Sequence, residues 1–178
     1  KALLPLCGIH MITHVIERAK AIEGISDVIL ATGRGAENDP LADIAAECEV
    51  KIFRGSESDV LERYYKASSE TYCDYVIRIT GDNPLTDHES ASSALKHAYK
   101  TGADHCTTSG IPLGTGVEVI KKTALERAYN EVVLTSRLVD AISKLNPNIP
   151  NDVRDEAVKN VLRVQHTTLL ANNEAFHK

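Results

Sequence analysis

The sequence predicts an α/β fold in which a mostly parallel β-sheet is sandwiched by helices. Short apolar runs typical of buried strands begin near residues 26, 50, 75 and 103, about 25 residues apart, with amphipathic segments between them. This alternation is the spacing of successive βαβ units, which build parallel sheets with right-handed crossovers. With 178 residues, of which 43% are hydrophobic and 25% charged, the chain can form one domain with a substantial core.

Each expected element has a local signal. Apolar, β-branched runs predict strands, and apolar residues three and four apart predict amphipathic helices. The expected strands are 26–32, 50–53, 75–80, 103–108 and 117–120. The expected helices are 11–21, 40–48, 59–65, 88–100, 123–132, 134–145 and 153–164. The residues expected to cap helix starts are Asp39, Ser58 and Asp87, and Gly102 is expected to end a helix.

Composition and charge argue against several classes of protein. A net charge of −5 does not fit a general nucleic-acid binder, which needs a basic face. No apolar run approaches the roughly 18 residues of a membrane span, and no signal-peptide pattern is present, so we expect a cytoplasmic protein. The four cysteines are scattered without a C-x-x-C pair, which predicts reduced thiols rather than a zinc site. His10 and His14 have a metal-ligand spacing, but no third ligand is evident nearby.

The segment 75–85 is the stretch around which the rest of the chain is organised. Its apolar run predicts a buried strand, which Gly81-Asp82-Asn83-Pro84 stops abruptly. Asp82 therefore follows the carboxyl end of an expected central strand, where open α/β sheets bind ligands. An ordinary turn is the alternative reading, because all four residues are common in turns.

Several charged residues are expected near this same edge of the sheet. Asp82 and Glu118 are the carboxylates best placed to share Mg²⁺, which takes one or two protein carboxylates and completes its shell with water and phosphates. Arg54 and Arg78 would balance phosphate charge. The glycine-rich segment 109–118 would let the backbone approach a sugar or nucleotide closely. Together these residues favour phosphoryl or nucleotidyl transfer.

Two central blocks also resemble a known family. Residues 50–65 (VKIFRGSESDVLERYY) and 76–85 (VIRITGDNPL) closely resemble the spore-coat polysaccharide biosynthesis protein F family, cytidylyltransferase-like proteins related to acylneuraminate cytidylyltransferases. Segments 114–119 and 124–128 look like the family's next blocks. The resemblance implies a nucleotide-diphospho-sugar transferase (GT-A-like) fold. It also implies that a hydroxyl of a sugar or sugar acid attacks the α-phosphate of CTP with help from Mg²⁺, releasing pyrophosphate, for surface polysaccharide or glycan biosynthesis.

The resemblance implies roles for individual residues. Asp82 resembles the first metal-binding aspartate of that fold, and Glu118 matches the acidic residue of the family's D-V-E block. Asp82 and Arg78 are the expected catalytic residues. The expected nucleotide-binding and substrate-binding residues are Lys1, Arg54, Thr80, Asn83 and Gly114.

The sequence departs from the family pattern at three places. Gly116 stands where many relatives have the Asp of D-V-E, which leaves Glu118 as the acidic residue of that block. The family's first strand and phosphate-binding loop should precede Ala2, and only Lys1 resembles a part of them. We therefore expect an intact protein with upstream residues, and a chain that began at Lys1 to expose strand edges and be poorly stable and inactive. The family's R-E-H-V-T-like segment has its only counterpart at 163–167.

Other functions are compatible with the same sequence. One keeps the fold but uses another nucleotide or transfers a glycosyl group. Another is a non-catalytic relative that binds nucleotide or partner proteins. A third is a flavodoxin-like binding domain, whose phosphate loop Gly33-Arg34-Gly35 resembles only faintly.

The chain is expected to change character after residue 131. Residues 1–131 should form the nucleotidyltransferase core, and 132–178 a helical C-terminal segment of the same domain. One side of an expected helix in this segment could form a homodimer contact, through Leu134, Leu138, Ile142 and Leu145.

Overall fold

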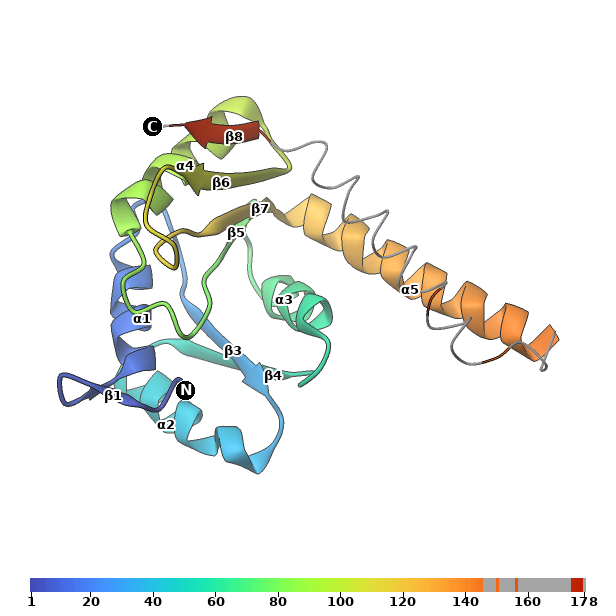
Figure 1. Cartoon of the computed structure of the whole chain (residues 1–178), viewed down its shortest axis with the longest axis horizontal. Coiled ribbons are helices and arrows are strands. Elements are labelled where there is room, and N and C mark those ends of the chain that lie inside the picture. Colours follow the sequence, from blue (N-terminus) through green and yellow to red (C-terminus); the bar gives the residue numbers. More distant parts are fainter. Residues whose placement is uncertain (146–149, 151–155, 157–173, 178) are drawn as a thin grey trace.

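The chain folds into an α/β structure, as the strand and helix spacing predicts. A computed structural model describes residues 1–145, 150, 156 and 174–177. The elements alternate between strand and helix over most of this length, and helices lie on both sides of the strands (Figure 1).

The strands form three hydrogen-bonded groups. A hairpin near the amino end contains β1 (Pro5–Leu6) and β2 (Ile9–His10). A parallel pair contains β3 (Ile29–Gly33) and β4 (Lys51–Gly55). The largest group has the order β5-β7-β6-β8, made of β5 (Tyr75–Arg78), β6 (His105–Ser109), β7 (Glu118–Lys121) and β8 (Glu174–His177).

One strand runs against the predicted parallel order. β7 is antiparallel to both of its neighbours, so that β5 and β6 on either side of it point in the same direction. The segment 110–117 that joins β6 to β7 contains no helix. A parallel connection needs a crossover of about a dozen residues or more, so this short segment can only reverse the chain.

The helices cover both sides of the strands. They are α1 (Met11–Lys20), α2 (Asp39–Glu47), α3 (Val60–Ser69), α4 (His88–Thr101) and α5 (Lys122–Leu145), with a short 3-10 turn, η1 (Ala36–Asn38), before α2. In Figure 1, α1, α2 and α4 lie on one side, α3 lies on the other, and α5 leads away from the body.

Buried apolar side chains form two clusters. One joins α4 to the sheet and includes Leu95 and Val119. The other joins α1 to α2 and includes Ile12 and Ile44. Ile79, just past β5, packs against both clusters. The polypeptide that enters the 80–87 loop is thereby anchored to the whole core.

The expected start and end of α4 are confirmed. The Asp87 carboxylate accepts hydrogen bonds from the backbone N–H groups of Glu89 and Ser90, both at 3.2 Å. Gly102 ends the helix with a φ of 70°, a left-handed conformation that glycine adopts without steric cost. The loop before α4 is therefore fixed to a well-defined helix start.

Two other predicted caps are wrong. Asp59, not Ser58, caps α3, because its carboxylate accepts from the backbone N–H of Glu62 at 2.8 Å. Asp39 lies inside the first turn of α2 and makes no capping bond. Its carboxylate pairs instead with the Arg54 guanidinium at 2.6 Å. The Asp39 carboxylate thus binds the Arg54 side chain of β4 and not the N–H groups of its own helix.

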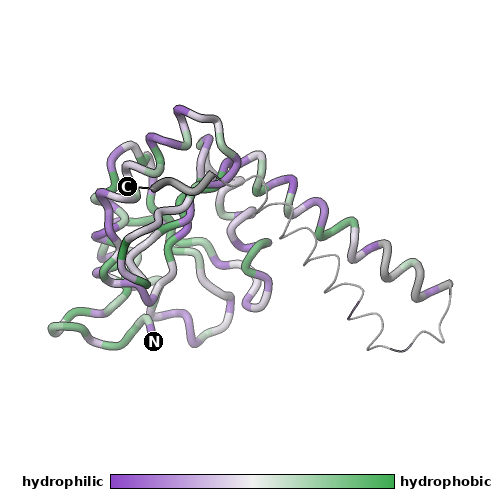
Figure 2. The backbone as a smooth tube through the Cα atoms, turned by 45° about the horizontal axis from the view of Figure 1, so that its top comes forward, coloured by the Kyte–Doolittle hydropathy of each residue, from purple (hydrophilic) through white to green (hydrophobic). Residues whose placement is uncertain are grey.

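The β1–β2 hairpin projects from the body as an apolar feature (Figure 2). Cys7 and Gly8 connect its strands with φ values of 52° and 81°, the left-handed conformations of a type I′ turn. Leu4, Leu6 and Ile9 are exposed to solvent at its surface.

His10 and His14 attach this hairpin to the start of α1. His10 Nδ1 lies 2.9 Å from the Leu3 carbonyl oxygen, and His14 Nε2 lies 2.9 Å from that of Leu6. The four-residue spacing of the two histidines thus presents both rings to backbone carbonyls.

The carboxyl-terminal part differs from the expectation. α5 is continuous through residue 132, where one helix was predicted to end. Tyr129 stacks on Tyr65 of α3, with ring centroids 4.3 Å apart and an interplanar angle of 14°. Neither α5 nor any other helix among the described residues is long and apolar enough to cross a membrane.

The short strand β8 was not predicted. It pairs in parallel with β6, opposite Cys106 to Ser109. Apart from residue 156, which is helical, the expected helix 153–164 lies outside the described residues, as does the segment 163–167.

We predict that Val119→Ala destabilises the fold by about 2 kcal/mol, because it removes two methyl groups from a site without solvent exposure and leaves a cavity. The measurement is the free energy of unfolding in urea. Val60→Ala deletes the same atoms at a site 42% exposed on α3 and should change stability by less than about 0.5 kcal/mol. Equal effects of the two substitutions would contradict the core assigned here.

Candidate active site at the carboxyl edge of the sheet

The loop that follows β5 is a rigid double turn. The Asn83 N–H donates to the Thr80 carbonyl at 3.1 Å, and the Thr86 N–H donates to the Asn83 carbonyl at 3.2 Å. The Thr86 hydroxyl donates to the same Asn83 carbonyl at 2.8 Å, and Thr86 is fully buried. The buried threonine therefore holds Asp82 in a loop of fixed shape.

The glycine-rich segment after β6 lies against this loop. The Asp87 N–H donates to the Thr115 carbonyl at 2.8 Å. A Cβ atom placed on Gly114 would lie 3.7 Å from Asn83 Oδ1. The structure thus brings together Asn83 and Gly114, two predicted nucleotide-binding residues that are far apart in the sequence.

Asp82 is the exposed carboxylate of this edge. In the part of the chain that the structure describes, its side chain has no hydrogen-bond or ion-pair partner. An exposed carboxylate on a rigid loop is available to a cation.

Arg78 and Glu118 form an ion pair across two strands. They are register partners in the β5–β7 ladder, and Arg78 Nη1 donates to Glu118 Oε2. The guanidinium also lies over the Tyr64 ring, 5.8 Å from its centroid. Burial acts to lower the pKa of Arg78, but the hydrogen bond and negative charge of Glu118 outweigh it and raise the pKa overall. Arg78 is therefore a permanent, oriented positive charge near the carboxyl end of β5.

The residues present suit Mg²⁺ bound together with substrate phosphates. Asp82 offers an unpaired carboxylate, whereas Glu118 is engaged with Arg78. No group of three or more His, Cys, Asp or Glu side chains among the described residues could hold a metal without other ligands. Mg²⁺ commonly takes only one or two protein carboxylates, so this edge fits a metal that arrives with its phosphate ligand.

Arg54 orders the turn that follows β3. Its guanidinium donates to the carbonyls of Gly33 at 3.2 Å, Arg34 at 3.3 Å and Gly35 at 2.7 Å, as well as to Asp39. Its donors are thus directed into this turn. Arg54 therefore fixes the backbone at the carboxyl end of β3.

Lys1 lies exposed at the start of the chain, whereas Gly116 lies against Thr108. Lys1 is exposed, and its carbonyl accepts from the Leu4 N–H at 2.8 Å. A Cβ atom on Gly116 would lie 3.1 Å from Thr108 Oγ1, closer than most Cβ contacts. A residue with a side chain at this position would therefore require Thr108 to move by a few tenths of an ångström.

Two residues of the site were not predicted from the sequence. The ring of Tyr64 lies against the Arg78 guanidinium, and its hydroxyl donates to the Ile79 carbonyl at 3.4 Å. Thr86 holds the Asp82 loop. The position of Thr86 three residues after Asn83 is a turn-capping pattern that could have identified it.

Comparison with known proteins identifies the family of the chain and its fold. A profile of the family described as cytidylyltransferase matches residues 1–139. The chain belongs to the cytidylyltransferase family. The family blocks seen at 50–65 and 76–85 fall within the matched region.

Three curated proteins are similar to this chain in sequence. An uncharacterized protein of Methanocaldococcus jannaschii is 37% identical over 129 residues, covering 72% of this chain and 53% of the relative. The spore coat polysaccharide biosynthesis protein SpsF of Bacillus subtilis is 27% identical, covering 75% of this chain and 61% of the relative. A 3-deoxy-manno-octulosonate cytidylyltransferase of Anaeromyxobacter is 26% identical, covering 99% and 67%. The chain thus spans about half the length of the first of these relatives.

Solved cytidylyltransferase structures share the fold. One from Leptospira borgpetersenii superimposes with a TM-score of 0.73 at 22% identity, covering 100% of this chain and 69% of that protein. A CMP:2-keto-3-deoxy-manno-octonic acid synthetase complexed with CTP gives a TM-score of 0.70 at 14% identity, covering 100% and 83%. The predicted nucleotide-diphospho-sugar transferase type of fold is thereby confirmed.

We predict that Thr86→Val lowers the free energy of unfolding by about 1 to 2 kcal/mol, because the shape is kept while a buried hydrogen bond is lost. Urea unfolding measures this change. Thr101→Val is the control: it removes an exposed hydroxyl that donates to the His97 carbonyl and accepts from the Ala103 N–H at the end of α4, and it should have a smaller effect because water can replace these bonds. A larger loss in the control would show that Thr86 does not hold the loop.

A second prediction concerns high pH. Burial raises the pKa of Tyr64, so the folded protein holds the phenol proton more tightly than the unfolded chain. Its contribution is present below the unfolded pKa near 10 and is lost as pH rises through the folded pKa, with a slope of up to about 1.4 kcal/mol per pH unit. Burial also raises the pKa values of Tyr75 and Tyr99, so Tyr64→Phe should reduce the alkaline loss of stability without abolishing it.

The measurement is urea unfolding at a series of pH values from 9 upward. Tyr72→Phe, at a fully exposed side chain, should leave the alkaline profile unchanged. An identical profile for Tyr64→Phe and the parent protein would contradict the prediction.

Proposed function

We propose that the protein transfers CMP from CTP to a sugar or sugar acid, releasing pyrophosphate, for surface polysaccharide or glycan biosynthesis. The observation that carries the proposal is the unpaired Asp82 carboxylate at the carboxyl edge of a cytidylyltransferase fold. Because the chain spans 53% of one relative's length, this is a proposal about the activity of the whole protein.

The proposed reaction is a displacement at the α-phosphorus of CTP. A substrate hydroxyl forms the new oxygen–phosphorus bond, the bond to the β-phosphate breaks, and pyrophosphate leaves with the electron pair. The hydroxyl proton passes to solvent. Bound Mg²⁺ would supply neutralisation of the phosphate charge.

Asp82 and Glu118 are the proposed carboxylates for Mg²⁺. Asp82 would bind it directly, since its side chain has no described partner to give up. Glu118 would have to exchange its bond with Arg78 for the cation. Once Glu118 turned away, the Arg78 guanidinium would be available to phosphate oxygens, which it binds through parallel N–H donors.

Most of the remaining predicted residues are proposed to contact the nucleotide, and one is proposed to shape the backbone around it. Thr80, Asn83 and Gly114 belong to the two adjoining loops at the edge and are proposed to contact the nucleotide. Lys1 is proposed to bind phosphate as a mobile positive charge. Arg54 is proposed to shape the 33–35 turn for the nucleotide rather than to touch it, because its donors bind that turn.

Isothermal titration with CTP and Mg²⁺ tests the proposal, using the longest natural form of the protein. ATP, GTP and UTP serve as controls for the base. Selective, Mg²⁺-dependent binding of CTP is expected, followed by pyrophosphate release when sugar acids are added. Absence of binding by any nucleotide would overturn the proposal and favour a non-catalytic relative.

We predict that Asp82→Asn weakens Mg²⁺-dependent CTP binding by more than about tenfold, equivalent to roughly 1.4 kcal/mol, because the amide lacks the negative charge that binds the cation. Asp43→Asn makes the same change at an exposed position of α2 and should bind CTP as the parent does. Undiminished binding by Asp82→Asn would remove Asp82 from the metal site.

A further inference from the structure

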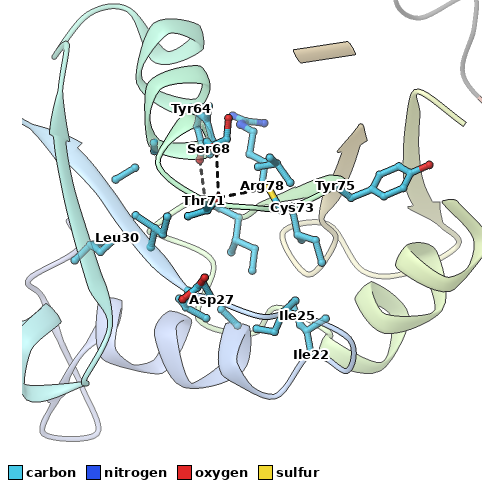
Figure 3. A pocket seen from close by; sticks show the side chains of 18 of the residues that line it. Ile22, Ile25, Asp27, Leu30, Tyr64, Ser68, Thr71, Cys73, Tyr75 and Arg78 are labelled. Atoms are coloured by element: carbon cyan, nitrogen blue, oxygen red, sulfur yellow. Dashed lines mark hydrogen bonds between the residues drawn. The ribbon is translucent and has the colours of Figure 1, made fainter. Parts of the chain in front are cut away.

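Arg78 has two side-chain partners of different chemical kinds. The first is the Glu118 carboxylate, to which Arg78 Nη1 donates. The second is Tyr64 of α3, whose ring centroid lies 5.8 Å from the Arg78 Cζ atom. Figure 3 shows Arg78 of β5 and Tyr64 of α3 next to each other. Of the two partners, only Glu118 carries a charge at neutral pH.

The hydroxyl of Tyr64 is oriented by a backbone carbonyl. It donates its proton to the Ile79 carbonyl oxygen at 3.4 Å, which leaves the lone pairs of the phenol oxygen free to accept. Burial acts to lower the pKa of Arg78, whereas the Glu118 carboxylate and then a hydrogen bond with Tyr64 act to raise it. Tyr64 therefore contacts Arg78 through both its ring and its hydroxyl.

The helix that carries Tyr64 is fastened through the residues on both sides of it. Arg63 Nη1 donates to the Ser56 carbonyl at 2.6 Å. Tyr65 stacks on Tyr129 of α5. Successive side chains of a helix point about 100° apart, so two contacts in different directions resist rotation of α3 about its axis. The Tyr64 ring is thus held in a fixed position relative to β5.

The two partners of Arg78 would respond differently to ligands. Glu118 is a carboxylate, and it is proposed to exchange Arg78 for Mg²⁺. Burial raises the pKa of Tyr64, so the phenol stays neutral at physiological pH. A neutral ring and hydroxyl can direct a guanidinium without neutralising it, so its charge stays available to phosphate oxygens.

A second partner matters at the moment when the first one leaves. Arginine is a long, flexible side chain, and its freedom is lost again when it binds a phosphate. With Glu118 bound to the cation, Tyr64 is the described side chain that still contacts the Arg78 guanidinium. A contact that persists through the exchange reduces the loss of entropy on binding.

We propose that Tyr64 is a positioning residue, which keeps the Arg78 guanidinium directed at the nucleotide phosphates after Glu118 has turned to the cation. This inference rests on the proposed function of the site. The 3.4 Å hydroxyl contact is long for a hydrogen bond, so the ring carries the larger share of the effect.

Nitrogen-15 NMR relaxation of the Arg78 Nε–H group tests the positioning without any nucleotide. Glu118→Ala removes the first partner and imitates the state in which Glu118 has left. The order parameter of Arg78 should stay above about 0.7 in this variant, and it should fall below about 0.6 when Tyr64→Leu is added. Arg127 is the control: it pairs with Asp104, and no aromatic ring lies against it in the described part of the chain. Asp104→Asn alone should leave Arg127 below about 0.6.

A double-mutant cycle tests the consequence for the nucleotide, in the same form of the protein as the CTP titration. Tyr64→Leu should weaken Mg²⁺-dependent CTP binding by about tenfold, whereas Tyr64→Phe, which keeps the ring, should weaken it by less than about threefold. In an Arg78→Met background, Tyr64→Leu should change binding by less than about twofold. Tyr64→Met takes the place of Tyr64→Leu if that variant does not fold.

Three results would count against these statements in different ways. An Arg78 order parameter that is as low in Glu118→Ala as in the double variant would overturn the positioning role. Equal weakening of CTP binding by Tyr64→Leu in both backgrounds would show that Tyr64 acts only on the fold. A parent protein that binds no CTP would overturn the proposed function, and the order parameters would still decide whether Tyr64 positions Arg78.

Discussion

The register between β5 and β7 is the constraint on which the candidate site depends. It places Arg78 of β5 directly opposite Glu118 of β7, and the side chains of these two register partners form an ion pair. Side chains alternate between the faces of a strand, so a slip of one residue would turn Glu118 to the opposite face of the sheet. The antiparallel pairing of β7 with β5 thus determines which charged side chains meet at this edge.

The charges of Arg78 and Glu118 at this edge balance each other before any ligand binds, while Asp82 adds an unpaired negative charge. Arg78 is held by a carboxylate and an aromatic face, while the nearby Asp82 carboxylate has no described partner. The ion pair is about one-third exposed on each side, at 35% and 40%, so solvent screens it and its net contribution to stability is small. The pair therefore orients the two side chains more than it stabilises the fold, and the proposed phosphate and metal ligands could replace it at little cost.

Much of this arrangement could be predicted from sequence, and the failures have physical causes. The strand at 75–78 and the loop carrying Asp82 follow from an apolar run ended by turn-forming residues. The reversal of β7 could not be read from strand spacing, because direction is decided by the length of a connection rather than by apolar pattern. The Asp39 and Ser58 caps were misassigned because local propensity does not reveal that Arg54 pairs with the Asp39 carboxylate, or that Asp59 caps α3 instead of Ser58.

One backbone hydrogen bond joins the two loops of the site, from the Asp87 N–H to the Thr115 carbonyl. Moving one loop away from the other would therefore cost this hydrogen bond, a net of about 1 kcal/mol. A nucleoside that ordered the glycine-rich segment would also order the loop that carries Asp82. A second ligand on that loop would then lose less conformational entropy on binding. For the proposed nucleotide and cation, this shared bond favours positive cooperativity, in which each ligand strengthens the binding of the other through the backbone.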